Sequence, residues 1–479
     1  MGITTLLVQC KSGDNPSAGN CNNKPNIIYI LADDLGYGDL GVYGQTKAET
    51  PNIDKLAANG MLFTRHYSGS AVCAPSRCVL LTGLHSGHSQ IRSNEELKER
   101  GDVWDHEAML ADSTLEGQLP LIAGTVTLAK LMQQGGYKTG MFGKWGLGPP
   151  DSESIPTKMG FDYFFGINCQ RMAHTYYPPF LYENDHRVYL KNKEYSPDLM
   201  FKELTAFVNR NKRNPFFLYW ATPLPHSALQ APQKWIDYYV DKFGDEQPYL
   251  NNKGAVAIRY PHATYAAMIS YLDENVGILV QQLKDLGIYE NTLIIFTSDN
   301  GSTDGGGRDS QWFNSGGPFR WEKGYNKGSL YEGGIRAPMI ASWPCKIKPG
   351  SVSDLISAFW DVLPTCCDIA GIKAPDNTDG ISFLPELTGK KQKKHDFLYW
   401  EFPSGGGQQA VITGNFKALR KNLNIGSTEF ELYNLKEDIK ETTNIAALHP
   451  EILQKVEMIG KKEHVKSQYK QWVIKGLEN

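Results

Sequence analysis

The chain has 479 residues, of which 41% are hydrophobic and 21% are charged, and its formal net charge at pH 7 is −3. This length allows a large folded core together with a smaller companion domain. The nearly balanced charge argues against a nucleic-acid-binding protein, which usually carries a clear basic excess. We also expect no membrane-spanning helix, because the sequence has no run of about 18 or more apolar residues.

The amino terminus resembles the end of a bacterial lipoprotein signal, with Cys10 as the residue that would carry the lipid. Residues 11–24 are small and polar, as in a flexible tether. A truncated signal is the alternative, because the apolar part is short and has no basic flank. We therefore expect residues 1–24 to be a signal remnant or tether, and the protein to be exported to the bacterial periplasm or cell surface.

Alternating strands and helices are predicted from residue 25 onward. Residues 25–32 form a continuous apolar run, which is typical of a strand buried on both faces of a parallel sheet. This alternation predicts an α/β domain over residues 25–374, with a large, mostly parallel mixed sheet flanked by helices. The other expected strands are 61–64, 138–143, 215–220 and 292–297, and the expected helices are 50–57, 127–132 and about 264–285.

The sequence pattern changes after residue 374. Short alternating segments are separated by Gly and Asn, which is typical of antiparallel strands joined by turns. A terminal amphipathic helix is expected from about residue 450. The pattern predicts a small α+β subdomain over residues 375–479, with antiparallel strands at 397–402, 409–412, 416–420 and 430–435.

Polar residues follow two of the buried strands directly. Asp33 and Asp34 come after the first strand, and Asp299 and Asn300 come after the strand at 292–297. Each pair alone is more simply explained as a turn. In an open parallel sheet, however, ligands bind beyond the carboxyl ends of the strands. Converging carboxylates need a cation, and oxygen ligands favour calcium first and magnesium second.

Candidate cationic residues lie in glycine-rich or proline-rich segments further along the chain. These are Lys144, His226 and Lys327. Each alone is more often a surface charge or a structural histidine. Together they would form the positive wall that a tetrahedral oxyanion requires.

The segment Cys73-Ala74-Pro75-Ser76-Arg77 precedes an apolar run that ends in Thr82-Gly83. Alone, it could be a small buried cysteine at the start of a helix with proline in the first turn. With the other motifs, it resembles the signature of the type I, formylglycine-dependent sulfatases of the alkaline-phosphatase superfamily. The resemblance extends from about residue 25 to the end, and the motifs occur in the family's order: 32–36, 73–77, 143–145, 225–226, 298–301, 327–334 and 431–435.

The resemblance implies an alkaline-phosphatase-like fold and a role for each matching residue. Cys73 would be converted to formylglycine by a separate maturation enzyme, and its hydrate would attack sulfate. Arg77 and Lys144 would orient that hydrate, while Lys144, His226 and Lys327 would bind sulfate. His226 or Lys327 would protonate the departing alcohol. The calcium ligands, with magnesium as the second choice, would be Asp33, Asp34, Asp299, Asn300 and an oxygen of the modified Cys73.

One position departs from the family pattern. Gly146 stands where the family often has a histidine, which is the usual candidate for accepting a proton from the hydrate. His85, His88 or His174 could supply this base from another loop, or water could do so.

Substrate specificity is expected in the loops around 90–116, 168–187 and 301–325. Together with export, these loops indicate a sulfated polysaccharide or its oligosaccharides, with galactose-type sugars as a candidate. The alternatives are a phosphate- or phosphonate-monoester hydrolase of the same superfamily and a non-catalytic glycan-binding relative. Candidate substrate contacts, for which loop packing is an equal alternative, are Asn94, Arg171, His174, Arg308, Trp312, Arg320 and Trp321.

Overall fold

The computed structural model describes residues 24–478, apart from 95–110, 113–114, 192 and 251–256. The expected signal segment with Cys10 lies outside the described residues, except for Lys24. Within the described part, no helix is both long and apolar enough to span a bilayer.

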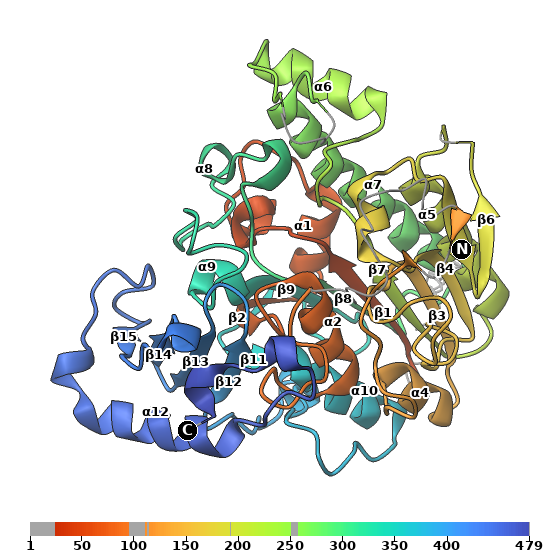
Figure 1. The fold of residues 1–479 in the computed structure, drawn as a ribbon. Coiled ribbons are helices and arrows are strands. Elements are labelled where there is room, and N and C mark those ends of the chain that lie inside the picture. Colours follow the sequence, from red (N-terminus) through yellow and green to blue (C-terminus); the bar gives the residue numbers. More distant parts are fainter. Residues whose placement is uncertain (1–23, 95–110, 113–114, 192, 251–256, 479) are drawn as a thin grey trace, which may run out of the picture.

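A large sheet forms the centre of the molecule (Figure 1). In the described part it has 11 strands, in the order β10-β2-β9-β8-β1-β7-β3-β4-β5-β6, and β11 also pairs with β2. Parallel pairing dominates around β1, while β9, β5 and β6 pair antiparallel to their neighbours. The strands are β1 (Asn26–Ala32), β2 (Met61–Tyr67), β3 (Lys138–Lys144), β4 (Tyr163–Ile167), β5 (Phe180–Glu183), β6 (His186–Tyr189), β7 (Phe216–Ala221), β8 (Thr292–Ser298), β9 (Arg336–Ser342), β10 (Ser351–Ser353) and β11 (Ser357–Ala358).

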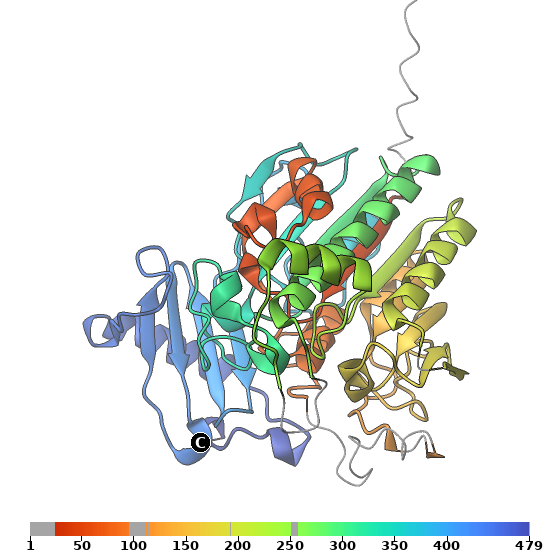
Figure 2. The same ribbon diagram turned by 90° about the horizontal axis from the view of Figure 1, so that it is seen from above.

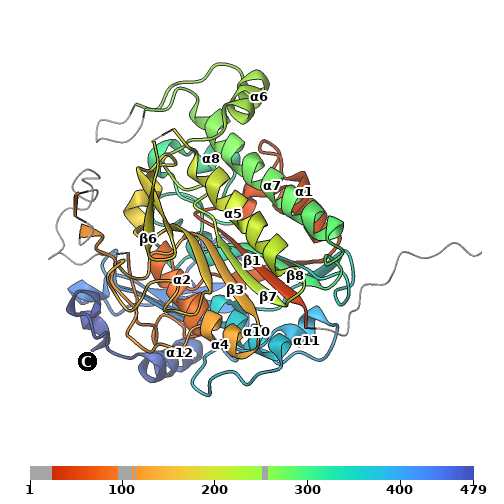
Figure 3. The ribbon, with the colours of Figure 1, turned by 90° about the vertical axis from the view of Figure 1, so that its right-hand side faces the viewer.

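Helices cover both faces of this sheet, so its central strands are buried on both sides (Figure 3). One face carries α1 (Pro51–Ala58), α5 (Ser196–Asn211) and α7 (Pro261–Asp285), and the other carries α2 (Cys73–Thr82), α4 (Leu128–Gln134) and α10 (Val362–Ala370). Every residue of β1, β7 and β8 is buried. The predicted α/β architecture with a mostly parallel mixed sheet is confirmed. The other α-helices of the described residues are α6 (Gln233–Phe243), α8 (Ser310–Phe313), α9 (Glu332–Ile335), α11 (Leu384–Leu387) and α12 (Pro450–Glu463).

The register between β1 and β8 places the two acidic strand ends side by side. The strands are parallel, and Ala32 pairs with Ser298 at their carboxyl ends. The backbone N–H of Asp299 then donates to the carbonyl of Ala32 at 3.0 Å. The polar residues after both strands therefore leave the sheet at the same edge, as the sequence predicted.

A small antiparallel sheet follows in the carboxyl-terminal part of the chain and lies beside the large sheet (Figure 2). Its strands are β12 (Leu398–Phe402), β13 (Gln408–Thr413), β14 (Phe416–Arg420) and β15 (Glu431–Asn434). A separate apolar cluster, with Tyr399, Val411 and Val456 among its members, packs one face of this sheet against α12. The two predicted sheets are present, and a domain boundary between residues 374 and 375 stays a prediction.

A buried ion network connects the two sheets. Lys417 of β14 lies 2.9 Å from Glu332 of α9 and 3.0 Å from Glu441, and Arg336 lies 2.8 Å from Glu332. Lys417 is fully buried. Burial raises the pKa of Glu332, but Lys417 and Arg336 outweigh burial and lower that pKa to about 2. Lys417 therefore neutralises acidic groups that the junction of the two sheets would otherwise bury without compensation.

We predict that Lys417→Met lowers the free energy of unfolding by about 3–5 kcal/mol, because it leaves buried Glu441 without its cation and Glu332 with Arg336 alone. Lys421→Met is the matched control, since Lys421 pairs with Glu431 at 3.0 Å but its side chain is 34% exposed. We expect the control to lose less than about 1 kcal/mol. Denaturant unfolding of both variants measures the difference, and equal losses would contradict this account of the junction.

Candidate active site

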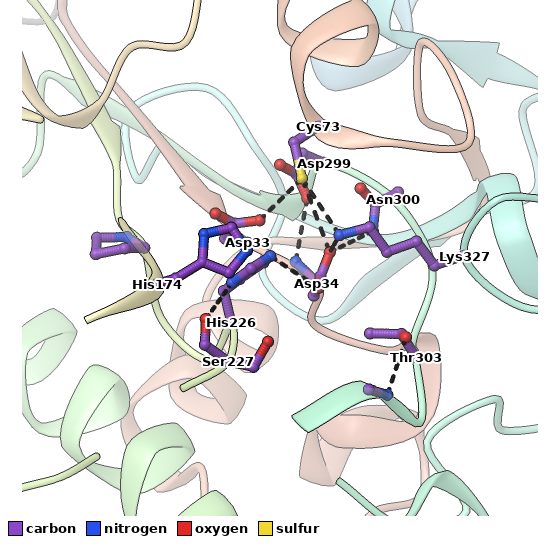
Figure 4. A network of polar contacts seen from close by, with 12 residues as sticks. Asp33, Asp34, Cys73, His174, His226, Ser227, Asp299, Asn300, Thr303 and Lys327 are labelled. Carbon is purple, nitrogen blue, oxygen red and sulfur yellow. Dashed lines mark hydrogen bonds and ion pairs between the residues drawn. The ribbon is translucent and has the colours of Figure 1, made fainter. Parts of the chain in front are cut away.

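The acidic strand ends form a buried cluster at the carboxyl edge of the sheet (Figure 4). Asp33, Asp34, Asp299 and Asn300 each have no exposed surface. Asp34 adopts a left-handed backbone with φ 64°, and its N–H donates to Asp299 Oδ1 at 3.1 Å. The Asn300 amide donates to Asp34 Oδ1 at 2.8 Å. Burial and the neighbouring Asp33 raise the pKa of Asp299 to about 6, which reflects the cost of placing carboxylates this close together.

Cys73 is the first residue of α2, and its side chain points into this cluster (Figure 4). Its Sγ lies 3.2 Å from Asp33 Oδ1, and Lys327 Nζ donates to it at 3.4 Å. Burial, followed by the charges of Asp299 and Asp33, raises the pKa of the thiol. Unmodified Cys73 is therefore held as a neutral thiol, which is a poor nucleophile and a poor metal ligand.

Four cations contact the carboxylates. Arg77 lies one helical turn after Cys73, on the same side of α2, and contacts Asp299 Oδ2 at 2.9 Å. The other three contacts are Lys144 with Asp33 Oδ2 at 2.6 Å, Lys327 with Asp34 Oδ1 at 2.6 Å, and Arg308 with Asp34 Oδ2 at 3.0 Å.

These cations determine the charge of the site. Burial alone would raise the pKa values of Asp33 and Asp34, but their cationic neighbours outweigh burial and hold both pKa values well below the usual range. Four cationic side chains then face three carboxyl groups. The cluster is suited to hold an anion, because its cationic side chains are buried and already oriented.

The donor set also fits a hard divalent cation. Asn300 Oδ1 is buried and has no hydrogen-bond partner in the described structure, although the adjacent side-chain nitrogen is bonded. An unpartnered buried oxygen beside three carboxylates is what a calcium or magnesium ion would satisfy. The sequence-predicted oxygen ligands are thus close together, and their role as metal ligands stays a prediction.

Arg308 is the cluster residue whose position the sequence missed. We predicted it as a substrate contact in a loop, and that role stays a prediction. Its guanidinium is buried against Asp34, and its Nη1 has no hydrogen-bond partner in the described structure. The chain reverses through Gly305–Gly307 before reaching it, and its Nε donates back to the Gly305 carbonyl at 3.0 Å. No spacing in the sequence indicates such a return path.

Two histidines lie beside the cluster. His226 Nε2 is 3.5 Å from Asp34 Oδ2, and its Nδ1 contacts the Ser227 carbonyl. The His174 ring stands edge-on to His226, with ring centroids 4.9 Å apart. Burial lowers the pKa of His226 well below its usual value. Burial and then Lys144 lower the pKa of His174 to about 4, so both imidazoles are neutral at pH 7 in this arrangement.

The three histidines that could act as the base in place of a histidine at position 146 lie in different parts of the structure. His174 is next to His226, whereas His85 and His88 stack on each other beyond the far end of α2 and contact Asp379 and Glu463. The ten-residue helix alone spans about 15 Å, so these two cannot reach Cys73.

The other predicted substrate residues have contacts within the protein. Asn94 accepts a hydrogen bond from the Ala74 N–H at 2.9 Å, immediately after Cys73. Trp312 stacks on His262 at 4.3 Å, and Arg320 lies 3.5 Å over the Tyr325 ring. Arg171 and Trp321 are half-buried. Substrate contact by any of these residues stays a prediction.

Comparison with known proteins gives consistent matches along the chain. The family model described as Sulfatase matches residues 25–372, and the one described as N-sulphoglucosamine sulphohydrolase, C-terminal, matches residues 317–468. N-acetylgalactosamine-6-sulfatase of Canis lupus familiaris is 31% identical over 441 residues, covering 87% of this chain and 75% of the relative. Arylsulfatase A of Homo sapiens is 34% identical over 425 residues, covering 82% and 74%.

A solved structure gives the same result in three dimensions. The crystal structure of Ps i-CgsB in complex with k-i-k-neocarrahexaose superposes with a TM-score of 0.75 at 29% identity. The match covers 92% of this chain and 93% of that one.

The surroundings of Gly146 explain why this chain does not place a histidine there. Gly146 has φ +72°, and an added Cβ would lie 2.6 Å from Gln170 Cγ. We predict that Gly146→His lowers the free energy of unfolding by about 1–3 kcal/mol for the left-handed backbone, plus the cost of displacing Gln170.

Gly287→His is the matched control for this substitution. Its φ is +69° with nothing within 4 Å of an added Cβ, so it isolates the backbone strain from the clash. Thermal unfolding should show the larger loss for Gly146→His, and combining that change with Gln170→Ala should recover part of it. Equal losses at the two glycines would contradict a clash with Gln170.

Proposed function

Because this chain belongs to the sulfatase family of sulfuric ester hydrolases, we propose that the cluster around Cys73 is its active site. The observation that supports this most strongly is the position of Cys73, buried at the start of α2 between the Asp33 carboxylate and the Lys327 ammonium. A neutral thiol there is inert, whereas an aldehyde hydrate at the same position would present an oxygen to a sulfate held by the surrounding cations. The proposal therefore requires conversion of Cys73 to formylglycine by a maturation enzyme.

We assign the remaining residues by what they contact. Asp33, Asp34, Asp299 and Asn300 would hold calcium, with magnesium as the less suitable ion. A bound calcium ion would supply charge that activates the nucleophile and stabilises the developing negative charge. Arg77 holds Asp299 and the Lys144 carbonyl, and so fixes the geometry on the helix side of the site.

In this proposal, basic side chains of the cluster bind the sulfate group and give a proton to the departing alcohol. Lys144, His226 and Lys327 bind the sulfate oxygens. The negative charge of the sulfate group balances the positive charge that remains when four cations face three carboxylates. The S–O bond to the sugar breaks as the new S–O bond to the residue-73 hydrate forms. The departing alkoxide takes a proton from Lys327, or from His226 once the bound sulfate has raised the pKa of its imidazole enough for the ring to be protonated.

His174 is our candidate for the base that the family usually supplies at the position of Gly146. A hydroxyl at residue 73 must lose a proton for the C–O bond to sulfate to break and the carbonyl to reform. The neutral His174 imidazole, beside His226, can accept that proton. The structure brings neither His85 nor His88 to this place.

We further propose that the substrate is a sulfated sugar derived from a polysaccharide, with galactose-type sugars as the first candidates. The relatives named above include an N-acetylgalactosamine-6-sulfatase, and the superposed crystal structure holds a neocarrahexaose. The lipoprotein-like pattern ending at Cys10 supports export to the periplasm or cell surface, where such polysaccharides are met.

Matched aryl sulfate and aryl phosphate esters test the reaction class. With protein shown by mass spectrometry to carry formylglycine, we predict faster turnover of the sulfate ester, because the relatives that this chain matches along most of its length are sulfatases. Sulfated mono- and oligosaccharides, including galactose-type sugars, then test the substrate class. Faster phosphate release would indicate a phosphohydrolase, activity confined to simple aryl sulfates would remove the sugar substrate, and sugar binding without sulfate release would indicate a non-catalytic relative.

The assignment of His174 predicts a specific defect. His174→Ala should lower kcat by at least about 100-fold, because it removes the base from the second half of the reaction. Alcohol should still be released once, and the peptide containing residue 73 should retain covalent sulfate in mass spectrometry. His449→Gln is the control and should turn over normally, because His449 directly precedes α12 and pairs with Glu451. If His174→Ala accumulates no sulfated enzyme, His174 is not the base.

A further inference from the structure

A second group of metal-type ligands lies away from the active site. His85 and His88 follow the carboxyl end of α2, Asp379 lies in the segment before α11, and Glu463 is the last residue of α12. One ligand atom from each of the four residues lies within 4.8 Å of the other three. We call these four residues the His85 cluster.

The spacing of these atoms is close to that of a tetrahedral metal site. His85 Nε2 lies 3.2 Å from Glu463 Oε2 and 3.8 Å from Asp379 Oδ2, and His88 Nδ1 lies 2.9 Å from Asp379 Oδ2. Nitrogen and oxygen ligands placed about 2.0–2.1 Å from a tetrahedral zinc ion are separated by about 3.3 Å. Small movements of these side chains would therefore surround one ion.

Neighbouring groups already orient the carboxylates of the His85 cluster. Lys462 Nζ holds Glu463 Oε1 at 2.7 Å, which leaves Oε2 facing the histidines. The His85 backbone N–H donates to Asp379 Oδ2 at 2.9 Å. Such contacts outside the ligand set are what fix ligands in metal sites. A cavity lined by His85, Asp379 and Glu463, and also by Lys393 and Lys394, adjoins the cluster.

The position of the proton on the His85 ring affects how readily a metal ion can bind. The Gly87 N–H donates to His85 Nδ1 at 3.2 Å, so the proton of the neutral ring lies on Nε2 without a metal. An ion at Nε2 requires that proton to move to Nδ1, at the expense of this long hydrogen bond. Both carboxylates can offset the charge of a divalent cation, so the bound site would be neutral.

We propose that the His85 cluster is a second metal site, which binds one zinc-like divalent transition ion. Two imidazoles and two carboxylates favour such an ion over calcium, which prefers six or more oxygen ligands. The ion would link α12 of the small-sheet part to the loop that follows the nucleophile-bearing helix α2. The proposal does not depend on the proposed function, because none of its four ligands belongs to the active site.

Cobalt(II) absorption and zinc titration calorimetry test the site in the full chain. Millimolar calcium is present throughout to saturate the predicted calcium site. We expect one zinc ion per chain, a visible Co²⁺ spectrum of tetrahedral type that zinc abolishes, and a higher apparent Tm with zinc. His88→Gln and Glu463→Gln should each weaken zinc binding by at least about tenfold, since even partners outside the ligand set are worth that much.

His395→Gln is the matched control, because His395 lines the same cavity but pairs with Asp361 at 2.7 Å instead. It should bind zinc as the unmodified protein does. The ligand variants should retain sulfate-ester turnover, so a loss of zinc binding is separable from a failure of the active site. The proposal is overturned if the protein binds no zinc under these conditions, or if both ligand variants bind zinc as tightly as His395→Gln.

Discussion

Three carboxylates buried at one edge of a parallel sheet are the constraint on which the rest of this structure depends. The register of β1 with β8 places Asp33 and Asp34 beside Asp299, all without exposed surface. Burying like charges this closely is unfavourable unless cations compensate for them. Three elements around the edge supply four cations: α2 supplies Arg77, β3 supplies Lys144, and the segment between β8 and β9 supplies both Arg308 and Lys327.

The same charges explain why the site suits a sulfate ester. The cations exceed the carboxylates by one, and they are held in place before any ligand arrives, so an anion meets an oriented positive surface. Cys73 lies between the two sets of charges, where burial and the acids keep its thiol protonated. The environment that makes the unmodified cysteine inert is therefore the one in which we propose that a hydrated aldehyde acts, with Asp33, Asp34, Asp299 and Asn300 as the residues that would hold a calcium ion.

Much of this arrangement could be predicted from the sequence. The parts that could not be predicted all depend on the conformation of loops. The β1 and β8 runs are apolar throughout because both faces are covered, and the acids directly after them had to meet at one edge. The position of Arg308 depends on a loop that turns back through Gly305–Gly307, and the choice among His85, His88 and His174 depends on where separate loops lie in space. The local sequence pattern does not show how such loops run through space. The close contact with Gln170 that disfavours a histidine at position 146 is likewise visible only in the structure.

If residue 73 acts as a formylglycine, the rate of sulfate release must depend on how much of Cys73 has been converted. Protein preparations that differ in the extent of maturation can be compared by quantifying the formylglycine form of the peptide containing residue 73 by mass spectrometry. The rate of sulfate release is then measured for each preparation. The account predicts a rate proportional to the formylglycine fraction, extrapolating to zero for protein that contains only cysteine. Full turnover by the unconverted protein would contradict it.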